Sequence, residues 1–351
     1  MIEIVKPEWL VGNEKRFSDF ISELNDKDRV ALISHGADID GIVSAKIIDS
    51  VINPDFIKFV GYTEINSELV EELRNAEVNK VIFSDIHLKE GDILKEIEKF
   101  AEILIIDHHI IFRDFNSSRI VFMSAKGLCA SYLAYYLFSK VQNLERFDWL
   151  TAVACVADFT YQENSKWMYS VFKKYGDKFV IGQDNLIMPG GKFWQVYEDL
   201  ALAIVYFQGD VIKVFNAIGE GFGNIGHLAG YAGAVREYME ESIERFERGR
   251  KEIKGRIFWE FAPRYKVGAM IATLVSSKAK YHSKTIIIGR NEGNVYSISA
   301  RRQDGKEDMN VLLMNLTSGF QNADGGGHIK AAGGYVSLKD KAEFIKRLEK
   351  I

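Results

Sequence analysis

The sequence has few cysteines from which covalent cross-links could be made. Only two of its 351 residues are cysteines, Cys129 and Cys155, and each lies in an apolar run without a neighbouring cysteine in a Cys-x-x-Cys pair. We therefore expect neither a disulfide framework nor a zinc site built from thiolates. Both cysteines are better interpreted as small buried hydrophobic residues.

Long apolar stretches and an excess of positive charge are missing as well. The first residues, MIEIVKPEWLVGNEKRF, carry charges throughout, and no later stretch has the length and apolarity of a membrane span. We expect a cytoplasmic protein that binds no membrane. The formal net charge of −4 provides no bulk attraction to a polyanion, but it is compatible with a local basic cleft.

The order of apolar patterns predicts an α/β fold with two domains, because 351 residues exceed a typical single core. Between about residues 29 and 122, short apolar runs alternate with helical patterns, as in a doubly wound, mainly parallel sheet. The predicted strands are Arg29–Ser34, Ile57–Gly61, Lys80–Ser84, Glu102–Ile106 and Arg119–Phe122, and helices are predicted at Ile42–Val51 and Ser67–Asn75.

The remainder of the chain predicts a helical segment, a connector and a smaller α/β domain. Residues from about 127 are helical in pattern, and REYMEESIERFERGRKEI has one apolar face, which indicates an amphipathic connector helix. A helix packed on its own domain is the equally favoured alternative. The predicted domains are 1–230, a connector at 231–255, and 256–351, with strands at VGAMIATLV, KTIIIGR and VYSISARR and a closing helix at KAEFIKRLEK.

Acidic and imidazole side chains directly follow three of the predicted strands. Because the carboxyl ends of parallel strands line one crevice, we expect these side chains to converge. A single acid at such a position usually caps a helix, but three strands that end in this way make that interpretation poor. Asp158, near the end of WLTAVACVADF, is a candidate only because the other acids and histidines are present. The residues are His35, Asp38 and Asp40 in ALISHGADIDG, Asp85 in VIFSD, and Asp107, His108 and His109 in ILIIDHH.

This ligand chemistry predicts divalent cations and phosphoester hydrolysis. Carboxylates and imidazoles without thiolates suit manganese or magnesium better than structural zinc. So many carboxylates around one cation would leave an excess of negative charge, which two cations would balance. Paired metals about 3.5–4 Å apart recur in phosphoryl chemistry. We therefore predict two Mn²⁺ ions, with Mg²⁺ as the alternative.

In this order, the motifs resemble those of the DHH phosphoesterase superfamily, which is named after the triplet formed here by Asp107, His108 and His109. The resemblance includes HGADIDGIVSA, VIFSD, the triplet, GLCAS and ADF, while SISARR and GGGHIKAAGG resemble the DHHA1 domain. It implies that His109 faces the scissile phosphate as a charge stabiliser or proton donor. It further implies that Asp107 orients an imidazole by a hydrogen bond without binding a metal itself. It also implies one metal bound by His35, Asp38 and Asp85, and a second bound by Asp40, Asp85, His108 and Asp158.

His35 departs from the family pattern, because RecJ-like members place the histidine two residues before the first aspartate and here the interval is three. The DHHA1 resemblance implies substrate contacts from Ser299, Arg301 and His328, and a close approach of the backbone to an anion at Gly325, Gly326 and Gly327. GGGHIKAAGG is expected to lead straight into a small-residue helix. We interpret the GxGxxG match at residues 221–226 as a loop, because no strand precedes it, and His87, His227 and His282 as surface or capping residues.

Within the superfamily, ADIDG is closer to the DxDG pattern of RecJ-like members than to the NPDGD motif of small-nucleotide hydrolases. The resemblance therefore favours a single-strand exonuclease of the compact archaeal RecJ-like type, similar to the Hef-associated nuclease, which releases mononucleotides 3′→5′ from DNA or RNA. The alternatives are a nanoRNase-like or pAp-phosphatase-like enzyme, a cyclic-dinucleotide phosphodiesterase, and a non-catalytic Cdc45-like scaffold. A homo-oligomer and a repair or replication protein partner are both compatible with this interpretation.

Overall fold

The computed structural model describes residues 2–88, 91–182 and 187–351, which divide into two compact units, Met1–Ala232 and Gly233–Ile351. The sequence predicted the first boundary between residues 230 and 231, with a separate connector after it. Across the described ranges, no helix is both long and apolar enough to span a membrane.

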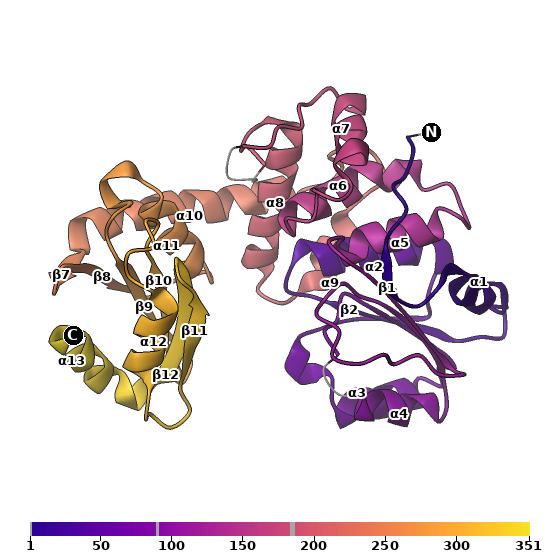
Figure 1. Cartoon of the computed structure of the whole chain (residues 1–351), viewed down its shortest axis with the longest axis horizontal. Helices are drawn as coiled ribbons and strands as arrows, with labels where there is room; N and C mark the ends of the chain where they lie inside the picture. Colours follow the sequence, from indigo (N-terminus) through magenta and orange to yellow (C-terminus); the bar gives the residue numbers. More distant parts are fainter. Residues whose placement is uncertain (1, 89–90, 183–186) are drawn as a thin grey trace. The chain divides into compact units, whose positions relative to one another are not determined.

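The first unit is built around a six-stranded sheet with the order β1-β6-β5-β4-β2-β3 (Figure 1). All of its strand pairs are parallel except β1 with β6. This confirms the predicted doubly wound, mainly parallel sheet. The strands are β1 (Trp9–Val11), β2 (Val30–His35), β3 (Phe56–Val60), β4 (Lys80–Ser84), β5 (Glu102–Ile106) and β6 (Ile120–Ala125).

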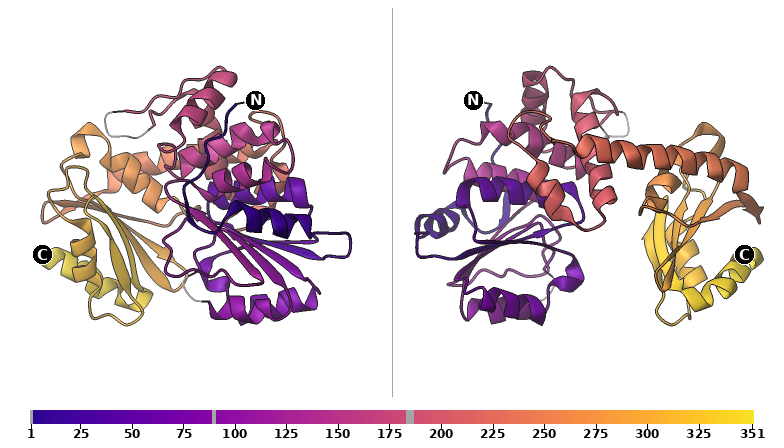
Figure 2. Two further views of the ribbon diagram at one scale, coloured as in Figure 1. Left: turned by 45° about the vertical axis from the view of Figure 1, so that its right-hand side comes forward. Right: turned by 180° about the vertical axis from the view of Figure 1, so that it is seen from behind.

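Helices cover both faces of this sheet, and alternate strand residues belong to different cores. Leu32 and Ile82 pack with one set of helices, whereas Ile33 and Phe83 pack with the other. Figures 1 and 2 show α3 and α4 on one side of the sheet and α2 and α5 on the other. The helices are α1 (Glu14–Ser22), α2 (Ile39–Ile52), η1 (Tyr62–Glu64), α3 (Ser67–Asn75), α4 (Asp92–Glu98), α5 (Ala130–Phe138), η2 (Glu145–Phe147) and α6 (Asp148–Ala157).

The predicted helical segment continues with α7 (Ser165–Lys174), α8 (Gly191–Phe207) and α9 (Val211–Ala217). Their apolar side chains, among them Trp167, Phe193 and Val214, join the same core as α2 and α5. The GxGxxG match lies in the loop between α9 and α10 (Leu228–Gly249), as predicted. No strand precedes it, so the sequence match does not form a dinucleotide-binding turn.

The second unit contains a second six-stranded sheet with the order β11-β12-β10-β9-β8-β7, antiparallel except for β8 with β9. Ile287 of β9 shares a core with Leu313 of α12 and Phe344 of α13. The elements are β7 (Lys251–Ile253), β8 (Arg256–Phe261), α11 (Gly268–Ser276), η3 (Ala279–Tyr281), β9 (Ile286–Glu292), β10 (Val295–Arg301), α12 (Met309–Thr317), β11 (Asp324–His328), β12 (Ala331–Ser337), η4 (Leu338–Asp340) and α13 (Lys341–Lys350).

The helix predicted at 231–255 ends earlier, at Gly249, and residues 251–253 form β7 instead. The cause is a two-residue hairpin: Lys254 and Gly255 both have positive φ, 51° and 77°, as in the type I′ turn that commonly joins two antiparallel strands. The second half of α10 packs on its own unit, since Phe246 contacts Trp259 with ring centroids 5.7 Å apart. The alternative interpretation of a helix packed on its own domain therefore describes this half.

Two other predictions of secondary structure were wrong. VGAMIATLV forms helix α11 instead of a strand, because it connects β8 to β9, and a parallel pair needs a crossover connection. GGGHIKAAGG forms the β11–β12 hairpin and not the start of a helix. Its small residues allow close packing: a Cβ added to Gly325 would lie 2.8 Å from Thr317 Oγ1 on α12.

Gly41 provides a test of how tightly the start of α2 is built against the end of β2. A Cβ on Gly41 would lie 2.1 Å from the backbone oxygen of His35. We expect Gly41→Ala to lower the free energy of unfolding of the first unit by about 1–3 kcal/mol through overpacking. Chemical denaturation followed by circular dichroism measures this. Gly230→Ala on α10 is the control, because its Cβ would meet nothing within 4 Å; equal losses in both variants would contradict the steric argument.

Candidate metal centre

The carboxyl ends of β2, β4 and β5 bring the predicted ligands together. His35 is the last residue of β2, Asp85 follows β4, and the Asp107–His109 triplet follows β5. Asp158 joins them as the C-cap residue of α6. Among the described residues, three groups could each hold a metal ion. Within each group, the potential ligand atoms lie within 4.8 Å of one another. The groups are His35, Asp38 and Asp85; Asp85, His108 and His109; and Asp40, His108 and Asp158.

Asp85 belongs to two of these groups and has the most unusual environment. It is 1% exposed and adopts a left-handed backbone with φ of 56°. Its Oδ1 lies 3.5 Å from His108 Nε2, and its Oδ2 lies 3.7 Å from His35 Nδ1. Within the described part of the chain, this buried Oδ2 accepts no hydrogen bond. Because buried carboxylate oxygens without hydrogen bonds are costly, the environment fits an atom that binds a cation.

Asp40, which lies in α2, is bound by the first turn of α5. Its two carboxylate oxygens accept hydrogen bonds from the backbone amides of Ala130 and Ser131, each at 2.8 Å. These amides form the N-terminus of α5, where the helix dipole favours a negative charge. This explains why GLCAS accompanies the acidic motifs. Burial, together with the nearby Asp85 charge, raises the pKa of Asp40 to about 8.

His35 reaches the site despite its shifted spacing. Its Nδ1 lies 3.1 Å from Asp38 Oδ2, while Asp38 Oδ1 accepts a hydrogen bond from the amide of Gly41 and thereby caps α2. Asp38 therefore caps α2, as a lone acid would, and is also a candidate ligand together with His35 and Asp85. The extra residue between the histidine and the first aspartate does not separate them.

Asp107 contacts His109, which belongs to one of the three candidate groups. The two side chains form a hydrogen bond of 2.7 Å between Asp107 Oδ1 and His109 Nδ1. Burial lowers the pKa of His109, but the hydrogen bond and the charge of Asp107 outweigh this effect and leave it raised. The arrangement fixes the imidazole ring and favours its protonated form, as expected for a histidine that donates a hydrogen bond to an anion.

The donor set fits divalent cations that prefer oxygen and nitrogen ligands. It contains carboxylates and imidazoles, whereas the two buried cysteines, with their sulfurs 3.7 Å apart, belong to none of the three groups found among the described residues. His35, Asp38 and Asp85 would hold a cation on one side, and Asp40, His108 and Asp158 on the other. Asp85 lies close enough to both imidazoles to serve the two sides.

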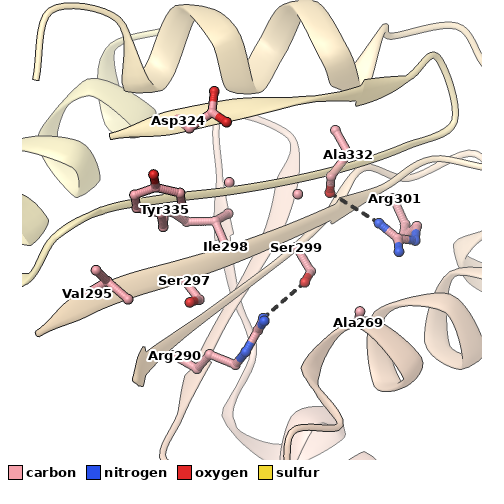
Figure 3. A pocket seen from close by; sticks show the side chains of 12 residues that line it. Ala269, Arg290, Val295, Ser297, Ile298, Ser299, Arg301, Asp324, Ala332 and Tyr335 are labelled. Carbon is pink, nitrogen blue, oxygen red and sulfur yellow. Dashed lines mark hydrogen bonds between the residues drawn. The ribbon is translucent and has the colours of Figure 1, made fainter. Parts of the chain in front are cut away.

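The second unit contains a pocket of about 410 Å³ that is lined by two arginines (Figure 3). Arg301 donates to the backbone oxygens of Ala300 and Ala332, at 2.9 and 3.1 Å. Arg290 donates to Ser299 Oγ at 3.0 Å. Burial, and next to it the charge of Arg290, lowers the pKa of Arg301. The guanidinium of Arg290 also pairs with Glu292, Nε to Oε1 at 2.6 Å. Arg301 is therefore the better suited of the two to a phosphate-bearing ligand.

Ser299 and Arg301, predicted from the sequence, line this pocket, but Gly325, Gly326, Gly327 and His328 are not among its lining residues. Two of the glycine amides are already used, because Gly325 N donates to Asp324 Oδ1 and Gly327 N to Asn310 Oδ1. His328 is exposed on β11. Sequence reasoning missed Arg290, although it follows the buried apolar run of β9 just as the acids follow theirs.

Removal of the Asp85 carboxylate should affect metal binding on both sides. We expect Asp85→Asn to weaken Mn²⁺ binding by more than about 100-fold, because the effect on a direct ligand should exceed that of a supporting group. Asparagine tolerates the left-handed backbone and has nearly the same volume as aspartate, so the metal-free fold should survive. Metal content and calorimetric titration measure this. Asp92→Asn, an exposed acid on α4, is the control; tight binding by Asp85→Asn would refute the assignment.

Metal binding should release protons and strengthen with pH. In the metal-free protein, burial lowers the pKa values of His35 and His108, but the carboxylates around them prevail and raise both to about 10. Both imidazoles are therefore protonated at neutral pH and must lose a proton to bind a metal. We expect affinity to rise between pH 6 and 8 by about tenfold per pH unit for each proton released. Titration in buffers of different ionisation enthalpy counts the protons, and pH-independent affinity would contradict the prediction.

Comparisons with known proteins agree with this architecture. Residues 263–351 match the DHHA1 domain family, and no curated protein matches the chain in sequence. A crystal structure of exonuclease RecJ bound to manganese matches with a TM-score of 0.65 and 13% identity, over 100% of this chain and 96% of that one. RecJ from Thermus thermophilus in complex with Mn²⁺ matches with a TM-score of 0.65 and 14% identity, over 100% of this chain but only 55% of that one.

A third structure, the pGpG-specific phosphodiesterase PggH from Vibrio cholerae, matches with a TM-score of 0.50 and 11% identity, over 92% of this chain and 98% of that one. Identities this low establish the fold alone. The match at 263–351 falls in the second unit, where SISARR and the glycine-rich hairpin lie. Residues 263–351 thus match the DHHA1 domain family, and the chain as a whole shares the fold of the RecJ structures.

Proposed function

We propose that the protein is a metal-dependent phosphodiesterase that trims single-stranded nucleic acid as an exonuclease. The observation that carries this proposal is the position of Asp85, buried between two groups of histidines and aspartates at the carboxyl edge of a parallel sheet. The fold adds support, because exonuclease RecJ bound to manganese and RecJ in complex with Mn²⁺ or Mg²⁺ each match over 100% of this chain.

Each part of the centre has a defined task in this proposal. The carboxylates of Asp40 and Asp85 would hold two Mn²⁺ ions, with Mg²⁺ as a substitute. Bound divalent cations supply neutralisation of phosphate charge and a lowered pKa for an attacking water. His109, oriented by Asp107, donates a hydrogen bond or a proton to the phosphate. In the second unit, Arg290 and Arg301 would bind a phosphate group.

A non-catalytic scaffold agrees poorly with the composition of the site. Asp40 and Asp85 are both buried, and each disfavours the ionised form of the other unless positive charge lies between them. In a protein that neither binds metal nor catalyses a reaction, neutral residues at these positions would remove the repulsion between the carboxylates. The complete set of ligands therefore favours an enzyme over a Cdc45-like binding protein.

A small-nucleotide phosphodiesterase is the second candidate, and the likeness to PggH over 92% of the chain favours it. The likeness to RecJ is greater, with a TM-score of 0.65 against 0.50, and it supports a long single strand over a small nucleotide as the substrate. We propose 3′→5′ polarity from the resemblance to compact archaeal RecJ-like proteins. Single-stranded DNA or RNA is the proposed substrate, and a stiff duplex would have to be opened first.

An end-labelled strand separates these possibilities. With Mn²⁺, a single strand labelled at its 5′ end should give a descending ladder, because trimming from the 3′ end leaves the label on the shortened strand. A duplex of the same sequence should be spared, chelator should stop hydrolysis, and added Mn²⁺ should restore it. Immediate release of labelled mononucleotide would show that degradation starts at the 5′ end and would overturn the proposed 3′→5′ polarity. Hydrolysis of a dinucleotide without attack on the long strand would favour the second candidate, and full activity in excess chelator would overturn the metal site.

A further inference from the structure

Three aromatic rings form a stack that begins at the candidate centre and ends at the surface. The rings of His109 and His87 are nearly parallel, with centroids 5.1 Å apart and an interplanar angle of 4°. Phe112 continues the stack on His87, with centroids 5.3 Å apart and an angle of 13°. No sequence pattern connects His87 with the DHH triplet, and it was interpreted as a surface or capping residue.

The outer end of this stack is open to solvent. Phe112 is 61% exposed, and Ile110, three residues after Asp107, is 76% exposed. Single exposed apolar residues are common on protein surfaces and need no explanation. Here, however, the exposed ring lies parallel to an imidazole that itself stacks on the histidine beside the carboxylates. The three rings thus form one stack that runs from His109 at the centre to Phe112 at the surface.

Structural support of His109 does not account for the whole column. The orientation of His109 is already fixed by its 2.7 Å hydrogen bond to the buried Asp107. His87 covers one face of the His109 ring, but Phe112 lies one ring further out and is not needed for that contact. A hydrophobic residue without a flat ring would cover His87 equally well. The exposed face of Phe112 is therefore suited to stacking with a ligand that also has a flat ring.

We propose that Phe112, supported by His87, is a stacking platform for the nucleobase next to the scissile phosphate. This inference rests on the proposed function and deepens it, since it concerns the same centre. Stacking suits a nuclease that must accept any sequence, because every base presents a π-face. The adjacent Arg113 is exposed, with its guanidinium 5.3 Å from the ring of Phe115, and it can meet the phosphate on the far side of the stacked base.

The first test measures stacking without turnover. A short single strand carries 2-aminopurine at both terminal positions, because the fluorescence of this base falls when it stacks. Binding is titrated in Ca²⁺, and the strand is checked by electrophoresis to be intact. We expect Phe112→Leu to weaken binding about tenfold and to lose the fluorescence decrease, whereas Phe112→Trp keeps both. Tyr169→Leu, which removes an exposed aromatic from α7 of the same unit, is the control and should behave like the unchanged protein.

The second test uses hydrolysis in Mn²⁺ to distinguish stacking from a structural role. Phe112→Leu should raise the KM for a normal strand about tenfold, but it should have no further effect on a strand whose terminal nucleotides are abasic. Equal losses on both strands would mean that Phe112 only supports the fold, and would overturn the inference. So would unchanged 2-aminopurine binding in Phe112→Leu. Normal stacking in a protein that cleaves no strand would leave the platform intact and refute the proposed exonuclease function instead.

Discussion

The repulsion between buried carboxylates at one edge of the first sheet is the constraint on which the rest of this structure depends. Asp40 and Asp85 are both buried, and Asp158 and Asp38 stand close by. Such a cluster is tolerated only where positive charge compensates it. In the described residues this compensation comes from His35 and His108, from the amides at the start of α5, and, in the proposed function, from bound cations.

This constraint explains why several local features occur together. Gly41 must lack a side chain because α2 starts directly against the backbone of His35. Asp85 adopts a left-handed backbone that directs its carboxylate between two imidazoles. Such backbone strain persists where the surrounding structure holds it, and functional sites are where it is commonly found. Close packing at Gly41 and the clustered carboxylates therefore lie at the same sheet edge.

The sequence was most informative where one local pattern has one structural meaning. Apolar runs that end in Asp85 or in the Asp107–His109 triplet predicted both the strands and their shared edge, since parallel strands leave few other arrangements. It was least informative where one pattern fits two structures. The apolar run of α11 suits a buried strand as well as a buried helix, and only the parallel pairing of β8 with β9 decides between them. The glycine-rich segment was misinterpreted because the need for small residues arises from α12, which lies elsewhere in the sequence.

The N-terminus of α5 has a consequence for how the chain folds. Its N-cap residue is Cys129, which makes no side-chain capping hydrogen bond, so the amides of the first turn are satisfied by a carboxylate 90 residues upstream. Helix caps normally come from the adjacent sequence and can form as soon as the helix does. Here the amides of Ala130 and Ser131 find their acceptor only when α2 lies against the start of α5. The end of one helix and the position of a candidate ligand therefore depend on the same non-local contact.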